Sequence, residues 1–241
     1  MKYLQLIFFF TFTISAFSQN ADSIKVGQPF KDFDELHYEP YDFEVYMVRD
    51  GKKTPSMPMK STTKKVIING KEYVEISHAF SLPSMQGGFT ALVEAETFKP
   101  VIQIRNSRKG KEAYRFLDNQ VIGLDSAKQN TAADYKTDLN EPMFNFELDL
   151  ETYSILPFED GKELYIPFFH AGGQANPGWY KYTVTSAKID VEGLGSVDAW
   201  VLFTDYKGTQ PTKFWYTKKG REFVKMEGTY QGMKIYKVRK F

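Results

Sequence analysis

The C-terminal stretch 193–238 constrains the fold more than any other part of this sequence. It contains four runs rich in β-branched and aromatic residues, separated by short turns that contain glycine. This pattern is typical of a four-stranded antiparallel meander. In the first run, Trp200 and Leu202 fall on one face of the strand, and Val201 falls on the other. Both faces are apolar, so we expect this strand to be covered on both sides.

The first 18 residues have the pattern of a secretory signal peptide. A short basic start, Met1-Lys2, precedes an apolar run at 4–16, and Ala16-Phe17-Ser18 gives a small-x-small cleavage site. The apolar run is too short to span a bilayer, and no later segment approaches the length of a membrane-spanning helix. We therefore expect an exported protein, periplasmic or secreted, with no transmembrane segment in the mature chain.

Charge and cysteine content exclude several classes of partner and chemistry. The 241 residues include 31 basic and 30 acidic side chains and no cysteine. Loss of Lys2 with the signal peptide leaves a formally neutral chain, which argues against nucleic acid as a partner and against strong electrostatic binding to anionic membranes. The absence of cysteine excludes a cysteine nucleophile, thiolate metal sites, a lipidated N-terminal cysteine and disulfides.

Upstream of the meander, short alternating runs with turn signals predict further antiparallel strands. The strongest hairpin signal is Asn69-Gly70, between runs at 62–68 and 71–80. Further strands are expected at 41–48, 89–96, 101–105, 112–117, 120–124, 163–169, 179–185 and 187–192. Such regular spacing favours an antiparallel sheet or barrel over βαβ units.

The expected organisation is a single β domain after an N-terminal arm. Residues 19–40 are polar and mixed, and we expect them to form an arm that packs loosely before the sheet begins. The β domain would span 41–241 in two lobes, joined by a polar loop near 125–142 that lacks periodic apolar residues.

One helix is predicted, at 143–156. Leu148, Thr152 and Ile155 share one face at helical spacing, and Pro157 stops the helix. Its other side would be acidic and solvated, formed by Glu147, Asp149 and Glu151.

Several short motifs together resemble a known family. A Thr-x-x-Pro connection at 97–100 links two strands, and Leu156-Pro157 follows the predicted helix. The pair Phe214-Trp215 begins a late strand that ends in a Lys-Met-like step, here Lys225-Met226. In these motifs, over roughly 41–238, the chain resembles a family of exported bacterial proteins classed only as a domain of unknown function.

The resemblance implies a mainly β fold, with one large, strongly curved antiparallel sheet and a short helix. This half-barrel or open barrel of meander hairpins would be similar in outline to periplasmic lipoprotein carriers and their outer-membrane receptors. Those carriers hold acyl chains in an apolar concavity, so the analogy implies a lipid-like ligand.

Candidate catalytic groups are few. His37 lies in the arm, and His78 alternates with apolar residues, so we place it on an outer strand face or in a polar core contact. His170, before Gly172-Gly173, is the only histidine in a loop where a base could be exposed. No nucleophile elbow or metal-ligand spacing is present. The sequence therefore predicts no catalytic residue, no metal site and no cofactor.

Paired carboxylates were weighed because glycoside hydrolysis needs two of them beside one sugar. Each pair is better explained as a solvated helix face, a turn former or an outward strand face. The pairs are Asp149 with Glu151, Glu159 with Asp160, and Asp190 with Glu192.

Aromatic side chains are the remaining signal, at 16% of the chain. They can line a lipid pocket or stack on sugar rings, or they can simply fill the core of a wide sheet. We predict that the ligand-binding residues, if the sheet has an open concavity, are Trp179, Tyr182, Trp200 and Trp215.

Three functional hypotheses follow. The leading one is a non-enzymatic envelope protein that binds an apolar or lipid-like ligand, such as a lipid or an acylated envelope molecule, in the concavity of its sheet. A second is a scaffold of the cell envelope that binds a protein partner through its edge strands or the 125–142 loop. A third is a glycan-acting hydrolase that uses His170 or the scattered carboxylates.

Overall fold

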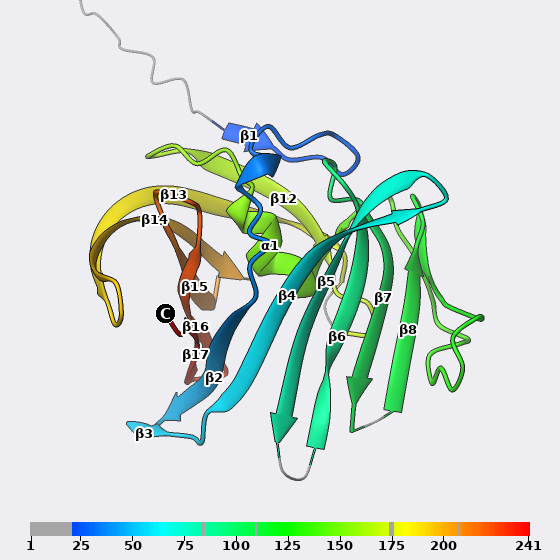
Figure 1. Cartoon of the computed structure of the whole chain (residues 1–241), viewed down its shortest axis with the longest axis horizontal. Coiled ribbons are helices and arrows are strands. Elements are labelled where there is room, and N and C mark those ends of the chain that lie inside the picture. The colour runs from blue at the N-terminus through cyan, green and yellow to red at the C-terminus, as the bar shows by residue number, and fades with distance from the viewer. Residues whose placement is uncertain (1–20, 83–84, 109, 174–175, 207) are drawn as a thin grey trace, which may run out of the picture.

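A computed structural model describes residues 21–241 apart from 83–84, 109, 174–175 and 207. The predicted signal peptide lies outside the described residues. All the described strands belong to one 17-stranded mixed sheet, which curves strongly without closing into a complete barrel (Figure 1). The prediction of a mainly β, barrel-like fold with a single short helix is confirmed.

The first half of the sheet is a meander of antiparallel neighbours. Its strands are β2 (Tyr41–Arg49), β3 (Lys52–Lys53), β4 (Met57–Ile68), β5 (Lys71–Leu82), β6 (Met85–Glu94), β7 (Pro100–Ser107), β8 (Gly110–Phe116), β9 (Gln120–Gly123) and β10 (Lys136–Asp138). Local turn chemistry sets this order. Asn69 and Gly70 both adopt positive φ, as the predicted tight hairpin between β4 and β5 requires.

The second half contains the predicted four-stranded C-terminal meander. Its strands are β12 (Glu163–Phe169), β13 (Gly178–Val191), β14 (Gly195–Tyr206), β15 (Gln210–Thr217), β16 (Phe223–Tyr230) and β17 (Met233–Arg239). The strands expected at 179–185 and 187–192 are one continuous strand, β13. Two short strands, β1 (Ala21–Ser23) and β11 (Phe144–Asn145), pair in parallel with β12. These parallel pairs make the sheet mixed.

The two halves of the sheet meet where the last strand pairs with an early one. β17 runs antiparallel to β2, with Tyr236 opposite Tyr46. The two rings stack with centroids 4.9 Å apart. Since these strands lie at opposite ends of the sequence, their pairing brings distant segments into one curved surface.

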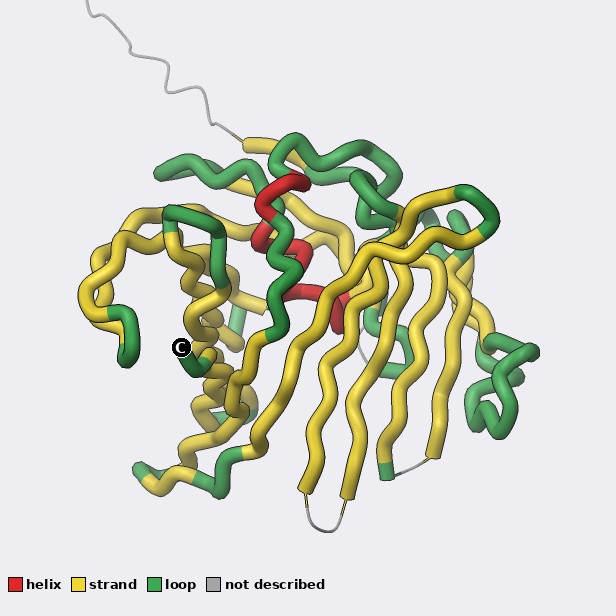
Figure 2. Tube along the Cα trace, viewed as in Figure 1, coloured by secondary structure: helices red, strands yellow, loops and turns green. Residues whose placement is uncertain are grey.

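The predicted helix is shorter than expected and lies inside the curve of the sheet. A 3₁₀ turn η2 (Phe146–Leu148) leads into α1 (Asp149–Ser154). Figures 1 and 2 show this helix between the long strands β4–β7 and the curled strands β13–β15. All six residues of α1 are buried, including Asp149 at 6% and Glu151 at 5% exposure. The predicted solvated acidic side is therefore wrong for Asp149 and Glu151, because the sheet encloses the helix and buries both side chains.

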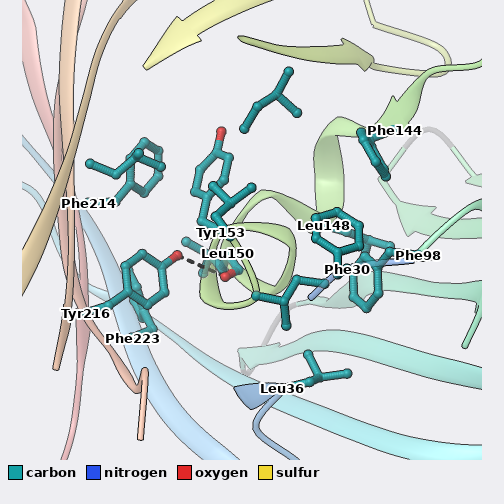
Figure 3. Close-up of a cluster of buried hydrophobic side chains, with 14 of the residues drawn as sticks. Phe30, Leu36, Phe98, Phe144, Leu148, Leu150, Tyr153, Phe214, Tyr216 and Phe223 are labelled. Carbon is teal, nitrogen blue, oxygen red and sulfur yellow. Dashed lines mark hydrogen bonds between the residues drawn. The ribbon is translucent and has the colours of Figure 1, made fainter. Parts of the chain in front are cut away.

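The core packs around this helix (Figure 3). Tyr153 is fully buried, and its ring lies 4.8 Å from that of Phe214 between centroids. The hydroxyl of Tyr216 donates a 2.9 Å hydrogen bond to the carbonyl oxygen of Leu150, shown as the dashed line. The helix is thus fixed to the β14–β16 side of the sheet through rings and through its own backbone.

The N-terminal arm also belongs to the core, so the expectation of loose packing is wrong. Phe30 and Leu36 are buried in the main hydrophobic cluster. The Phe30 ring lies 6.3 Å from that of Phe98 and 5.7 Å from that of Phe144 (Figure 3). The arm gains enough apolar contact there to be held over the helix. The described part of the arm contains the strand β1 and a three-residue 3₁₀ turn, η1 (Phe33–Glu35), and is otherwise irregular.

The polar segment 125–142 contains the strand β10 and is held by side-chain hydrogen bonds. The Asn130 side chain accepts from the backbone N–H of Ala113 at 2.8 Å and donates to the Ala113 carbonyl at 2.9 Å. An amide side chain can satisfy a backbone donor and acceptor together in this way. Among the helices in the described part of the chain, none is long and apolar enough to cross a membrane.

Candidate functional site

Beside the helix, the sheet encloses a cavity of about 850 Å³. Residues of both halves of the sheet and of the η2–α1 segment line it. Much of its wall is apolar and includes Phe43, Met57, Met59, Phe89, Phe214 and Met226. A second hollow of about 820 Å³ shares part of this wall, including Phe43, Met59 and Phe89. The concavity of the sheet is therefore filled by the helix in one part and open in another.

The exposure of the lining residues distinguishes the inner end of the cavity from its mouth. Asp149, Phe43 and Phe214 on its wall are all buried. Tyr230, also on the wall, is 44% exposed, and Arg108 is exposed as well. The inner end is therefore next to the helix, and the mouth lies at the β16–β17 turn and the β7–β8 turn.

A cluster of charged side chains, here called the Arg105 cluster, forms part of the wall. It consists of Arg105, Glu112, Glu147 and His170. The Arg105 guanidinium donates from Nη1 to Glu112 at 3.1 Å and from Nη2 to Glu147 at 2.5 Å. Nη2 also donates to the carbonyl oxygen of Ala171 at 3.1 Å.

His170 completes the Arg105 cluster. Its Nε2 lies 2.9 Å from Glu147 Oε1 and 2.8 Å from Arg105 Nη2. The two hydrogens on Arg105 Nη2 are already donated to Glu147 and to the carbonyl oxygen of Ala171. The arrangement consistent with these bonds has a proton on His170 Nε2, which is donated to Glu147. Each carboxylate of the cluster therefore accepts from another member of it, Glu112 from Arg105, and Glu147 from both Arg105 and His170.

The surroundings of Glu147 keep it ionised. Burial alone would raise the pKa of its carboxyl, but the hydrogen bond from His170 and the charge of Arg105 lower that pKa from 4.5 to about 2. A carboxylate held in this way is a fixed negative charge at neutral pH, not a proton donor.

The depressed pKa of Glu147 predicts an acid-dependent stability. The folded-state pKa lies below the ordinary value of 4.5, so the ionised carboxylate stabilises the fold above pH 4.5, and this contribution is lost as the pH falls toward 2. The variant Glu147→Gln should be less stable than wild type at pH 7, and the difference should shrink between pH 4.5 and 2. Urea unfolding at a series of pH values measures it.

The matched control for this prediction is Glu75→Gln. Glu75 forms a surface ion pair with Lys64 at 2.8 Å and is outside the cavity. Its replacement should change stability by less than about 1 kcal/mol. A Glu147→Gln deficit that is as large at pH 2.5 as at pH 7 would contradict the assigned shift.

A buried pair, His78 and Glu151, joins the sheet to the helix. His78 Nε2 lies 2.7 Å from Glu151 Oε1, which also accepts from the Ser61 hydroxyl at 3.3 Å. Burial alone would raise the pKa of Glu151, but the charge and hydrogen bond of His78 lower it. The second oxygen, Oε2, is buried with no hydrogen-bond partner among the described residues. His78 is thus a polar core contact, one of the two placements predicted for it.

A third charged pair, Asp149 with Lys237, also lines the cavity. Lys237 Nζ lies 3.6 Å from Asp149 Oδ1. Burial raises the pKa of Asp149, although the charge of Lys237 acts in the opposite direction. Oδ1 accepts a hydrogen bond from the backbone N–H of Leu150 at 2.8 Å. The pair is therefore an ion pair without a direct hydrogen bond between its members.

A comparison with known protein families identifies the family of this chain. A family model described as "Protein of unknown function (DUF3108)" matches residues 41–237. The chain belongs to the DUF3108 family. The predicted resemblance to a family classed as a domain of unknown function is confirmed.

Two further comparisons were made for this DUF3108 chain. A search of curated proteins finds no match. A solved structure, the beta-barrel-like protein of domain of unknown function DUF1849 from Brucella abortus, is similar with a TM-score of 0.45 and 10% identity. The similarity covers 85% of the DUF3108 chain and 97% of the Brucella chain.

The four aromatic residues predicted to bind a ligand do not line the cavity of this DUF3108 protein. Trp179 is 39% exposed, and its indole N–H donates to Glu141 at 2.6 Å. Tyr182 is fully buried, with its hydroxyl 2.7 Å from that of Tyr153. A ligand-binding role for these residues stays a prediction, and the cavity wall is made by others.

Trp200 and Trp215 lie on opposite faces of the sheet. Trp200 is half-buried against the main core, whereas Trp215 is buried in a small cluster with Val201 and Val224. The register between β14 and β15 explains this separation, because Trp215 pairs with Val201 and not with Trp200. Val201 and Leu202 are both buried, as predicted for a strand covered on both sides.

The sequence indicated His78, His170 and the carboxylates Glu147 and Glu151, but not that these histidines pair with these carboxylates. Arg105 and Lys237 carry no local signal, because each lies in an ordinary strand pattern. The carboxylates of the run 146–151 did carry a local signal. In the run 146–151, Phe, Leu and Leu alternate with Glu, Asp and Glu, so a helix there has apolar residues all round and cannot present a purely solvated face.

Proposed function

We propose that this chain is an exported, non-enzymatic envelope protein that binds an apolar or amphipathic, lipid-like ligand in the cavity beside α1. The observation that carries the proposal is the open hollow of about 850 Å³ with phenylalanine and methionine side chains on its wall. This volume falls within the range of small-molecule sites, about 300–1,000 Å³. Export rests on the signal-peptide pattern at 1–18.

The methionines favour a flexible ligand. Met57 and Met59 line the cavity from β4, and Met226 lines it from β16. Methionine is unbranched and polarizable, so a wall that contains it adapts to chains of varied shape. All three are only partly buried, and Met226 packs against the edge of the main core. An acyl chain is the kind of ligand that such a wall accommodates best.

A glycan-acting hydrolase is the second candidate. Glu147 and Asp149 line the same cavity, and their pKa values move in opposite directions. Two carboxyl groups with such divergent pKa values are typical of acid–base pairs. We rank this function below binding, because the apolar wall suits a hydrocarbon chain better than a sugar, and because Glu147 is already paired within the Arg105 cluster.

The test is to find the ligand and to block its site. We expect protein purified without detergent from envelope fractions to release lipid into organic solvent, identified by mass spectrometry. Ile235→Trp narrows the cavity from β17, where Ile235 faces Gly228 in register. This variant should carry at least about tenfold less lipid.

Ile67→Trp is the matched control. Ile67 is 76% exposed on β4, outside the cavity, so the same substitution there should leave the lipid content unchanged. Circular dichroism checks that both variants fold. Wild-type protein free of lipid would overturn the binding function. If cross-linking in cells then recovered a single protein partner, the scaffold hypothesis would take its place, and cleavage of envelope glycan would support the hydrolase.

A further inference from the structure

The charged groups on the cavity wall differ in how completely they are satisfied. In the Arg105 cluster, the guanidinium has two carboxylate partners, and Glu147 accepts from both Arg105 and His170. The His78–Glu151 pair is joined by a direct bond of 2.7 Å. Each of these groups is therefore held by a direct hydrogen bond to a charged partner, although the buried Oε2 of Glu151 has no hydrogen-bond partner among the described residues.

The pair of Asp149 and Lys237 is different. Its 3.6 Å separation is too long for a hydrogen bond. Among the described residues, no hydrogen bond of the Lys237 ammonium is found, although this group has three donors. The Asp149 side chain is buried, whereas that of Lys237 is 25% exposed, so the pair lies where the inner end of the cavity remains open.

The two charges of this pair select the ligand's polar group. A purely anionic head would face the buried carboxylate of Asp149, and a purely cationic head would face Lys237. A head that carries both charges can place its ammonium toward Asp149 and its anion toward Lys237, and each contact becomes a charge-assisted hydrogen bond.

Resting on the proposed binding function, we propose that the cavity takes a single-chain zwitterionic amphiphile with its polar head inward, between Asp149 and Lys237. The alkyl chain of the ligand then runs outward along the cavity wall toward the mouth. Met57, Ile235 and Tyr230 line that outward part, and none of them is fully buried. The ligand is thus held with its head in the protein and its tail toward the opening.

Four probes with the same chain length separate the head-group contribution from the hydrophobic one. They are 2-aminotetradecanoic acid, tetradecanoic acid, tetradecylamine and tetradecan-1-ol, titrated by calorimetry below their micellar concentrations. We expect the zwitterionic amino acid to bind about tenfold more tightly than any of the other three. Equal affinity for all four probes would overturn the head-group inference and leave the binding function intact. Failure of every probe to bind would overturn both.

Variants of Asp149 and Lys237 should change the preference among the four probes in opposite directions. Lys237→Met should weaken binding of the amino acid about tenfold and strengthen binding of tetradecylamine, because the repelling charge is gone. Asp149→Asn should weaken binding of the amino acid and strengthen binding of tetradecanoic acid. The matched control is Lys234→Met, an exposed lysine on the same strand outside the cavity, which should keep the wild-type order.

The double variant Asp149→Asn with Lys237→Met is the control for a loss of folding in the single variants. It leaves neither charge unpaired in the core, so we expect it to fold and to bind all four probes with similar affinity. If the double variant still preferred the amino acid, the head group would be recognised elsewhere, and the assignment to this pair would be overturned.

The direction of the chain is tested with a photoreactive group. A diazirine at the chain end of 2-aminotetradecanoic acid should label Met57, Ile235 or Tyr230 at the mouth. Mass spectrometry of peptides locates the adducts. Adducts on the buried residues Phe43 or Phe214 would show that the tail enters first and would overturn the inward orientation.

Discussion

Replacement of His78 by leucine should lower the free energy of unfolding by about 3–5 kcal/mol. His78 is the direct partner of Glu151, which is 5% exposed and whose second oxygen has no hydrogen-bond partner among the described residues. Without the imidazole, the 3.3 Å contact from the Ser61 hydroxyl is the side-chain hydrogen bond that remains for this carboxylate among the described residues. A buried charge that loses its partner is among the most costly single changes in a folded protein. Guanidinium unfolding measures the loss.

The double variant His78→Leu with Glu151→Met separates the charge from the packing. It removes both members of the pair, so most of the lost stability should return. The effect should also depend on pH. The folded-state pKa of Glu151 is lowered, so its stabilising contribution is complete above the ordinary pKa and is lost as the pH falls through the folded value. A double variant no more stable than His78→Leu alone would mean that the imidazole stabilises by shape.

The strands could be predicted from the sequence because their signals are local. Asn69-Gly70 turns a hairpin wherever two alternating runs flank it, and the C-terminal strands are likewise separated by turns that contain glycine. Alternation also assigned Trp200 and Leu202 correctly to one face of β14. These properties depend on neighbours in the chain, so no knowledge of the sheet's curvature is needed.

The cavity and its charged pairs could not be predicted, because they depend on contacts between distant segments. Arg221 pairs with Asp32 across 189 positions, and Lys237 on β17 meets Asp149 on α1, a segment far from it in the sequence. The curvature of the sheet encloses α1, and so buries a helix that carries the two carboxylates Asp149 and Glu151. The register between β14 and β15 then places Trp215 opposite Val201, and so separates it from Trp200.

The helix itself should contribute much of the stability of the sheet through Tyr153. This residue is fully buried, and its ring packs against Phe168, Tyr182 and Phe214 from three different strands. Tyr153→Ala removes these contacts and leaves a void, so it should cost about 3–5 kcal/mol in the free energy of unfolding. Urea unfolding measures this value.

Tyr153→Phe is the control that keeps the ring and removes the hydroxyl. Tyr182 loses a 2.7 Å partner, but the Tyr206 hydroxyl remains 3.5 Å away, so the cost should be about 1 kcal/mol. The gap between the two variants measures what ring packing contributes to holding the helix inside the sheet. Equal losses would place that contribution in the hydroxyl network, and the helix would then be fixed by hydrogen bonds such as that from Tyr216 to Leu150.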